Sequence, residues 1–390
     1  MTVEERRARL GLRHALATEG HVGTAVDAAR AVVALHGTDP ASTVLSAVLR
    51  APGTTPQDVE RALYVERDLI RVLAMRRTTF AVPHELAATA LVAAGERVAA
   101  QQRALLARLV VEAGITDDPL PWLAQAERAL LAALDDLGEA TAPELAAADP
   151  LLAARVELGV GTRYTASPTV ASRLLTVLSA DGSVLRARPT GGWTSTQFRW
   201  TTPAAWRDLG PRPDPAVAAA DLARAWLHAY GPARPADLQW WTGWTVARTR
   251  AALAALDTVE VELEDGAPGL LLADDAEPVA APAPWVALLP ALDPTSMGWR
   301  HRDVFLGPHR GQVHDVNGNA GPTVWVDGRV VGGWAQRADG EVVTELLEDV
   351  GRAAREAVAE RAAAVRTVLG TVRLAARARG WTPVERRLRG

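Results

Sequence analysis

The sequence predicts a mainly α-helical fold with β wings: tandem winged-helix (helix-turn-helix) modules followed by a small β-barrel-like domain at the C-terminal end. Three observations support this prediction. Segments with helical periodicity recur through the first 276 residues. Hairpin-like segments follow groups of these helices three times, at 69–83, 184–200 and 258–275. A stretch rich in β-forming residues, broken by Gly, Asn and Asp, then occupies 284–345.

The clearest module is expected at 213–276. Its first helix, PAVAAADLARAWLHAY, is followed by Gly-Pro, which ends helices. RPADLQWWTG predicts a short second helix, and WTVARTRAALAAL predicts a third with Thr245 as its N-cap. TVEVEL and LLLADD, separated by the turn EDGAPG, predict two paired strands. Helix, helix, helix, hairpin is the order of a winged helix.

The same order is expected twice upstream. Residues 116–212 contain the helices WLAQAERALLAALDDLG and SPTVASRLLTVLSADG, followed by two strands around a Gly-Gly turn. Residues 1–115 contain several helical segments, the hairpin LIRVLAMRRTTFAVP and a long connecting helix over 86–115. Residues 277–390 form the last expected domain, a barrel or curled sheet followed by a helix and a basic end.

Composition excludes several kinds of chemistry. The 390 residues carry a formal net charge of -4 and no cysteine, which excludes disulfides, thiolate catalysis and cysteine-ligated zinc. The chain has no lysine, which excludes a lysine Schiff base and a Walker A loop. No signal peptide and no membrane span is recognisable, so a cytoplasmic protein without a membrane partner is expected.

The three hairpins differ in charge. The third is acidic, with Glu260, Glu262, Glu264 and Asp265, and phosphates would repel it. The first two carry arginines, so we expect them to bind double-stranded DNA while the third module acts as a spacer. The alternatives are solvated hairpin faces for the arginines and a packing role for the tryptophan. The expected DNA-binding residues are Arg71, Arg76, Arg77, Arg186, Arg188, Arg199 and Trp193.

Five stretches resemble a known family. They are VVALHGTDPAS, DVERALYVERDLIRVLAMRRTTFAVP, GGWTSTQFRW, LPALDPTSMGWR and NGNAGPTVWVDGRVVGGW. They resemble the winged-helix DNA glycosylases of the AlkZ/YcaQ type, which unhook interstrand crosslinks and remove bulky toxin adducts. The resemblance implies tandem winged helices with a C-terminal β-barrel, cupped around DNA.

The resemblance also implies a catalytic segment in the first module. The family has Gln-x-Gln or Gln-x-Asp there, whereas this chain has His36 and Thr38 at the two positions, followed by Asp39. Asp39 could stabilise an oxocarbenium-like state or polarise water, while His36 and Thr38 supply hydrogen bonds. The alternative is that Asp39 only caps the helix that begins at Pro40.

A second group of polar residues is expected to lie in a loop of the C-terminal domain. It contains His301, Asp303, His309, His314 and Asp315, but its spacing matches no metal motif and arginines interleave it. We therefore expect neither a metal nor another cofactor.

The sequence thus predicts a monomeric, monofunctional DNA glycosylase for duplex DNA with alkylated or crosslinked purines. It would act at the nucleoid in DNA repair or in self-resistance to a genotoxin. One alternative is a non-catalytic DNA-binding protein, a regulator or lesion sensor. A protein-interaction scaffold is the other, because winged helices also serve that role. The absence of a dimerisation segment and the additional C-terminal domain favour the enzyme.

Overall fold

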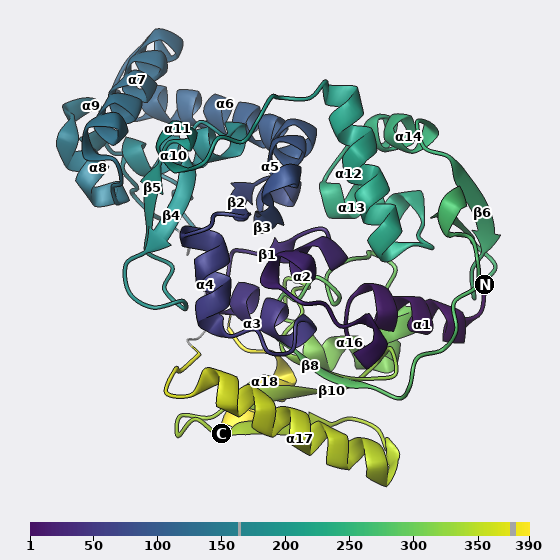
Figure 1. The fold of residues 1–390 in the computed structure, drawn as a ribbon. Helices are drawn as coiled ribbons and strands as arrows, with labels where there is room; N and C mark the ends of the chain where they lie inside the picture. The colour runs from purple at the N-terminus through teal and green to yellow at the C-terminus, as the bar shows by residue number, and fades with distance from the viewer. Residues whose placement is uncertain (163–164, 375–379) are drawn as a thin grey trace.

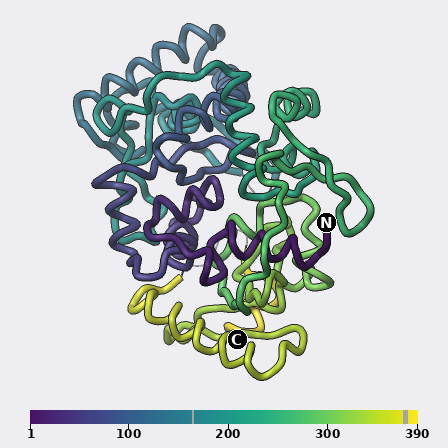
Figure 2. The backbone as a smooth tube through the Cα atoms, turned by 45° about the vertical axis from the view of Figure 1, so that its right-hand side comes forward, coloured from purple at the N-terminus to yellow at the C-terminus, as the bar shows by residue number. Residues whose placement is uncertain are grey.

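The structure, a computed structural model, describes residues 1–162, 165–374 and 380–390. It is a mixed helical fold with small antiparallel sheets (Figure 1). Within the described residues, no helix combines the length and the apolar character needed to cross a membrane. The purple N-terminal segment lies against the yellow C-terminal segment in both views (Figures 1 and 2).

The N-terminal segment is helical and ends in the first predicted hairpin. A two-stranded hairpin was expected, but the short strand β1 pairs with β3 through His36 opposite Phe80 and gives the order β1-β3-β2. This pairing holds the start of the candidate catalytic segment against the hairpin. The elements are α1 (Val3–Arg13), η1 (Thr18–Gly20), α2 (Ala25–Ala31), β1 (Leu35–His36), α3 (Pro40–Arg50), α4 (Pro56–Tyr64), β2 (Leu69–Leu73), η2 (Met75–Arg77) and β3 (Thr79–Pro83).

The expected connecting helix is a continuous helical segment with a π-helical turn in its middle. Gly95 ends that turn, where an added Cβ would lie 2.3 Å from the carbonyl oxygen of Ala180. The contact requires glycine and brings the run against the next group of helices. The run consists of α5 (His84–Ala90), the π turn η3 (Leu91–Gly95) and α6 (Glu96–Glu112).

The second group of helices has its own core, built around Leu123, Leu130 and Leu174. Two antiparallel strands follow it, as the Gly-Gly turn predicts. Its elements are α7 (Pro119–Leu137), α8 (Ala142–Ala148), α9 (Pro150–Ala153), α10 (Val170–Asp181), β4 (Leu185–Pro189), β5 (Phe198–Thr201) and α11 (Pro203–Trp206).

The third group follows the predicted order closely, and its acidic hairpin binds the N-terminal helix. Arg6 on α1 forms an ion pair with Glu264 at 2.5 Å, and Arg13 forms one with Asp275 at 2.5 Å. Both views show the N-terminus beside this hairpin (Figures 1 and 2). These carboxylates are therefore neutralised inside the molecule. The elements are α12 (Pro215–Tyr230), α13 (Pro235–Thr242), α14 (Val246–Ala254), β6 (Thr258–Glu262), β7 (Pro268–Leu272) and η4 (Ala273–Asp275).

The C-terminal part contains a four-stranded antiparallel sheet in the order β11-β10-β9-β8. A closed barrel would require β8 to pair with β11, and these strands are not paired with each other in the described chain, so the sheet is open. Helix α17 packs on β8 and β11, and α18 packs on β10. The elements are β8 (Val286–Leu289), α15 (Asp303–Leu306), η5 (Gly307–His309), α16 (Arg310–Val313), β9 (Thr323–Val326), β10 (Arg329–Gln336), β11 (Val342–Leu346), α17 (Gly351–Leu369) and α18 (Pro383–Arg389).

A buried ion pair joins the N-terminal segment to the C-terminal part of the chain. Arg50, at the end of α3, donates to Asp293 at 2.7 Å, and both side chains have 0% exposure. Ser46 donates to the same carboxylate at 2.6 Å, and the Arg50 guanidinium also donates to Thr295 at 2.8 Å. Burial raises the pKa of Asp293, but Arg50 and Ser46 outweigh it and hold the pKa below its ordinary value. This network fixes α3 against the loop that follows β8.

Asp293→Ala should strongly destabilise the protein, because it leaves the Arg50 charge buried without a counter-ion. Removing one partner of a buried pair costs about 3–5 kcal/mol. The measurement is the free energy of unfolding in urea. Glu356→Ala is the matched control, since it breaks the exposed Arg352–Glu356 pair and should cost less than about 0.5 kcal/mol. Equal losses in the two variants would contradict a structural role for Asp293.

Candidate active site

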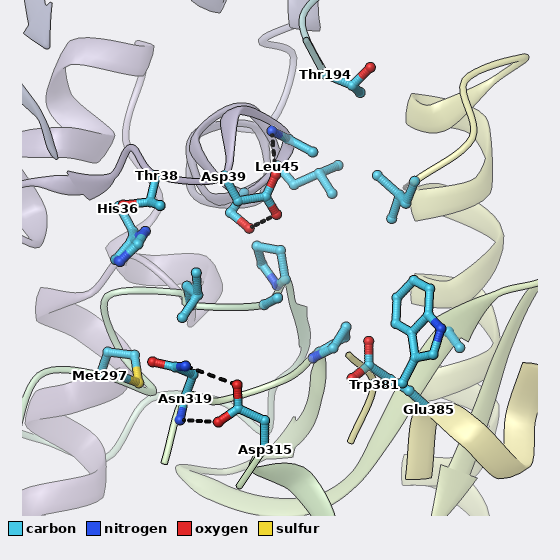
Figure 3. Close-up of a pocket in the computed structure, with 18 of the residues that line it drawn as sticks. His36, Thr38, Asp39, Leu45, Thr194, Met297, Asp315, Asn319, Trp381 and Glu385 are labelled. Carbon is cyan, nitrogen blue, oxygen red and sulfur yellow. Dashed lines mark hydrogen bonds between the residues drawn. The ribbon is translucent and has the colours of Figure 1, made fainter. Parts of the chain in front are cut away.

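A cavity of about 550 Å³, here called the central pocket, lies where the two ends of the chain meet. Figure 3 shows side chains from the N-terminal segment on one side and from the C-terminal sheet and helices on the other. From the N-terminal segment, the pocket is lined by His36, Thr38, Asp39, Ala41, Ser42, Leu45, Arg76, Arg77 and Thr78. The three predicted catalytic residues therefore lie together at one cavity.

The segment from His36 to Asp39 is held by backbone contacts on both sides. The Gly37 N–H donates to the carbonyl of Thr79 at 2.7 Å. Arg71 donates to the Gly37 carbonyl at 3.1 Å, and Thr43 donates to the His36 carbonyl at 2.8 Å. A Cβ at Gly37 would lie 3.1 Å from the Thr79 oxygen, so a larger residue would crowd β3. These hydrogen bonds hold the segment along the first hairpin, at the edge of the central pocket.

Asp39 is the N-cap of α3, as the alternative interpretation of this residue predicts. One carboxylate oxygen accepts from the Ala41 N–H at 3.2 Å, and the other accepts from the Ser42 hydroxyl at 2.8 Å. Asp39 also lines the central pocket and is half-buried (Figure 3). A carboxylate has about four lone-pair positions, so two hydrogen bonds leave acceptor capacity. Capping therefore orients the carboxylate without occupying it fully.

His36 is a buried, neutral imidazole at the pocket. It is 6% exposed, and its ring lies edge-on to Phe80 at 5.5 Å between centroids. Its Nδ1 atom is buried, and no described residue forms a hydrogen bond with it. Burial, with a smaller contribution from the positive charge of Arg76, lowers the pKa of His36 to about 3. A neutral imidazole offers one donor and one acceptor, which suits a bound water or a sugar oxygen.

Arg76 and Arg77 occupy the turn of the first hairpin and line the same pocket. Both have left-handed backbones, with φ of 52° and 56°, a conformation uncommon for residues other than glycine. Arg76 lies 4.0 Å from the ring centre of Trp240, and burial lowers its pKa to about 10. Neither arginine forms an ion pair with a described carboxylate. Their charges therefore make this side of the pocket attractive to an anion.

Two of the predicted DNA-binding residues have structural roles instead. Arg71 is 4% exposed and donates to the Gly37 carbonyl, so it cannot reach a phosphate on the surface. It lies 5.1 Å from the Phe198 ring. Trp193 is half-buried and packs between the main core and the core of the C-terminal sheet. A packing role, the alternative for this tryptophan, fits its position better than base stacking.

The remaining arginines of the second hairpin are engaged within the protein. Arg186 stacks on Phe198 at 5.2 Å and on Trp200 at 5.1 Å, and burial lowers its pKa to about 10. Arg186 is half-buried, and its contact with a phosphate stays a prediction. Two further arginines are paired but accessible, and their contact with DNA stays a prediction. These pairs are Arg188 with Glu60 at 3.1 Å, and Arg199 with Glu139 at 3.8 Å and Glu144 at 3.4 Å.

The histidines of the C-terminal loop point to separate partners. His301 contacts Asp237 at 3.0 Å, His309 contacts Glu348 at 3.0 Å, and the His314 ring contacts the Arg310 carbonyl at 3.2 Å. In residues 1–162, 165–374 and 380–390, no group of three or more His, Asp or Glu side chains is arranged to hold a metal.

The opposite side of the pocket was not predicted from the sequence. It includes Met297 and a rigid turn in which Asn319 donates to Asp315 at 2.9 Å (Figure 3). Trp381 and Glu385 complete it from α18 and the residues before it. The sequence pointed to this side only through the stretches LPALDPTSMGWR and NGNAGPTVWV, which resemble the family. These stretches contain no catalytic pattern.

Three comparisons with known proteins show what the chain is similar to. A family model described as DNA glycosylase AlkZ-like matches residues 29–368. The interstrand DNA cross-link repair glycosylase of Streptomyces sahachiroi is 35% identical over 179 residues, which are 44% of this chain and 48% of the relative. The match thus spans about half the length of this curated relative. The solved structure of Streptomyces sahachiroi DNA glycosylase AlkZ has a TM-score of 0.74 and 23% identity, covering 97% of this chain and 99% of that one.

His36 should remain uncharged as the pH falls from 8 to 5, because burial lowers its pKa to about 3. The measurement is an NMR titration of histidine-labelled protein, in which His36→Gln identifies the resonance. The unfolded chain binds this proton near pH 6.5. The contribution of His36 to stability is therefore complete above pH 6.5 and is lost progressively toward pH 3. A midpoint near 6.5 for this resonance would contradict its burial.

Proposed function

Because the chain belongs to the AlkZ-like DNA glycosylase family, we propose that it is a monofunctional DNA glycosylase. It hydrolyses the bond between an alkylated purine and its deoxyribose in duplex DNA. The single observation that carries the proposal is the Asp39 carboxylate, which lines the central pocket in the segment where the family has its catalytic residues. The chain has no lysine, so water rather than a lysine amine is the attacking group.

The chemistry requires little more than a fixed negative charge. Cleavage of an N-glycosidic bond passes through an oxocarbenium-like state, which a nearby carboxylate stabilises. A purine alkylated at N7 already carries a positive charge and leaves readily, so no strong general acid is needed. Asp39 is held by Ala41 and Ser42, and therefore needs little reorganisation during the reaction. It can also accept a proton from the attacking water.

His36 and Thr38 replace the glutamines of the Gln-x-Gln form of the family pattern by groups that can also both donate and accept a hydrogen bond. A glutamine amide offers donors and an acceptor; a neutral imidazole and a hydroxyl each do likewise. His36 is neutral because its pKa is lowered to about 3. Its Nδ1 atom has no hydrogen-bond partner among the residues that the structure describes. We assign His36 to the attacking water and Thr38, which is exposed, to the sugar or its phosphate.

The order of helices and hairpins supports three winged-helix modules at 1–115, 116–212 and 213–276, and a β-rich domain at 277–390. In this arrangement the unpaired Arg76 and Arg77 bind phosphates beside the lesion, because both line the pocket. The acidic third hairpin stays away from DNA, because α1 covers Glu264 while Glu260 and Glu262 remain exposed and repel phosphates. The protein binds duplex DNA as a monomer at the nucleoid in the cytoplasm.

The substrate we propose is a bulky or crosslinked alkylpurine. The curated relative is named an interstrand DNA cross-link repair glycosylase. The cavity of about 550 Å³ also exceeds the needs of a small alkyl group, because pockets of 300–1,000 Å³ hold drug-sized ligands. Removal of such lesions serves DNA repair or resistance to a genotoxin that the cell itself makes.

Asp39→Asn should reduce base release from duplex DNA containing an N7-alkylguanine by about 100- to 1,000-fold, the usual cost of losing one such electrostatic group. Asparagine caps helices as well as aspartate does, so the free energy of unfolding should change by less than about 1 kcal/mol. Asp214→Asn is the matched control. Asp214 also caps a helix that begins with proline, and it accepts from the Ala216 N–H at 2.8 Å.

Base release is measured by chromatography and stability by a urea titration of the same preparations. The Asp214→Asn protein should release the base at the rate of the unmodified protein. Normal release by Asp39→Asn would refute the catalytic role of the carboxylate. If the unmodified protein binds such DNA but releases no base from any alkylated duplex, the protein is a non-catalytic lesion binder.

Arg77→Ala should weaken duplex binding and lower the slope of log affinity against log salt concentration by about one, because one phosphate contact is lost. Arg352→Ala is the control and should leave the slope unchanged, since Arg352 is exposed on α17 and pairs with Glu356 at 2.8 Å. Fluorescence anisotropy across a series of salt concentrations measures both slopes. Identical slopes for the unmodified protein and Arg77→Ala would remove Arg77 from the DNA interface.

A further inference from the structure

Arg76 lines the central pocket, yet no described carboxylate forms an ion pair with it. Its side chain is half-buried, and its Nε atom has no hydrogen-bond partner among the described residues. A long, flexible side chain without polar partners does not keep one orientation, because many rotamers are then open to it. A phosphate-binding role for Arg76 therefore requires another group that holds the guanidinium in place.

The indole of Trp240 contacts this guanidinium. Trp240 lies on α13, in the third group of helices, and the Arg76 Cζ atom lies 4.0 Å from its ring centre. The backbones also lie close together at this point. Gly243 caps α13 with φ of 74°, and a Cβ added there would lie 3.4 Å from the Arg76 backbone nitrogen. The end of α13 is thus in contact with the turn that carries Arg76.

A second arginine contacts the same indole and is fixed by hydrogen bonds. The Arg302 Cζ atom lies 5.3 Å from the ring centre of Trp240, and the residue is only 4% exposed. Its guanidinium donates to the Ser296 carbonyl at 2.9 Å and to the Gly318 carbonyl at 3.2 Å. Repulsion from this fixed charge acts on Arg76, and the negative face of the indole offsets it by attracting both cations.

The contact with Trp240 leaves Arg76 able to bind an anion. Arg76 is positively charged at neutral pH, since burial lowers its pKa only to about 10. A guanidinium meets an aromatic ring with its flat face, so its N–H groups remain free at the edge. Those N–H groups match the oxygens of a phosphate in geometry and in charge. A phosphate would therefore supply the counter-ion that Arg76 lacks.

We propose that Trp240 is a positioning residue, whose indole holds Arg76 in the orientation that receives a DNA phosphate beside the lesion. This inference rests on the proposed function, and it gives the third module a part in the site, where the sequence predicts only a spacer. Trp240 does not line the pocket and acts through Arg76. Without the ring, Arg76 turns away from Arg302 and the phosphate contact is lost, although both arginines remain.

The test measures the affinity for duplex DNA by fluorescence anisotropy over a series of salt concentrations. Trp240→Leu keeps an apolar side chain but removes the ring. It should lower the slope of log affinity against log salt concentration by about one, as Arg76→Ala does, because one phosphate contact is lost. The double variant should have the same slope as each single variant, since both changes remove one contact. Trp240→Phe retains a ring and should restore most of the slope.

Trp206→Leu is the matched control. It removes an indole that Arg67 contacts at 4.0 Å outside the pocket, so it should leave the slope unchanged even if it lowers stability. Normal DNA binding by Trp240→Leu with an unchanged slope would overturn the role of Trp240. If the unmodified protein itself does not bind duplex DNA, the proposed function fails instead.

A second measurement needs no DNA and no loss of the ring. In the NMR spectrum of protein labelled in arginine, Arg76→Gln identifies the Nε–H proton of Arg76. This proton should resonate upfield of that of the exposed Arg352, because the ring current of the indole shields it. Trp240→Leu should abolish the upfield shift. An unshifted Arg76 proton in the unmodified protein would show that the indole does not hold this side chain and would overturn the proposal.

Discussion

The buried ion pair between Arg50 and Asp293 is the interaction on which the site depends. Arg50 ends α3, the helix whose first residues form one side of the central pocket, and Asp293 lies in the loop that forms part of the other side. Two unpaired charges in this position would be very costly, so each side chain requires the other. His14 extends the network, since its ring contacts Thr295 at 2.8 Å. The spacing of the pocket is therefore set by a contact that itself takes no part in chemistry.

Charged and neutral groups occupy different parts of the central pocket. The Asp39 carboxylate and the Arg76 guanidinium line the same cavity, yet they do not pair with each other. Burial keeps His36 neutral between them, with the pKa lowered to about 3. Under the proposed function, a positive charge for phosphate, a negative charge for an electron-poor sugar and a neutral ring for water can then coexist. The backbone must hold these groups apart. For the candidate catalytic segment, the hydrogen bonds from Arg71 and Thr43 do this.

Local patterns predicted the helices and hairpins well, because capping residues and hydrophobic periodicity act over a few positions. The hairpin at 258–272 and the helix at 215–230 are examples. The residues 36–39 were identified through their resemblance to a family pattern. Burial was harder to predict: Arg71 and Arg186 look like surface cations in the sequence, yet both lie against the ring of Phe198, which belongs to a different hairpin from Arg71 and to the same hairpin as Arg186. The place of Trp381 in the lining of the central pocket and the openness of the C-terminal sheet likewise depend on which distant faces meet, and no local pattern encodes that.

The ion pairs between α1 and the acidic hairpin also constrain how the molecule is made. Glu264 is synthesised 258 residues after its partner Arg6. At the usual rates of translation this is a delay of roughly 10–50 s, during which the helix has no final docking surface. Until then, the amphipathic face of α1 is either exposed in the nascent chain or protected by a chaperone. Helix α1 is therefore made long before the surface on which it docks, and it is among the last elements to reach its native position.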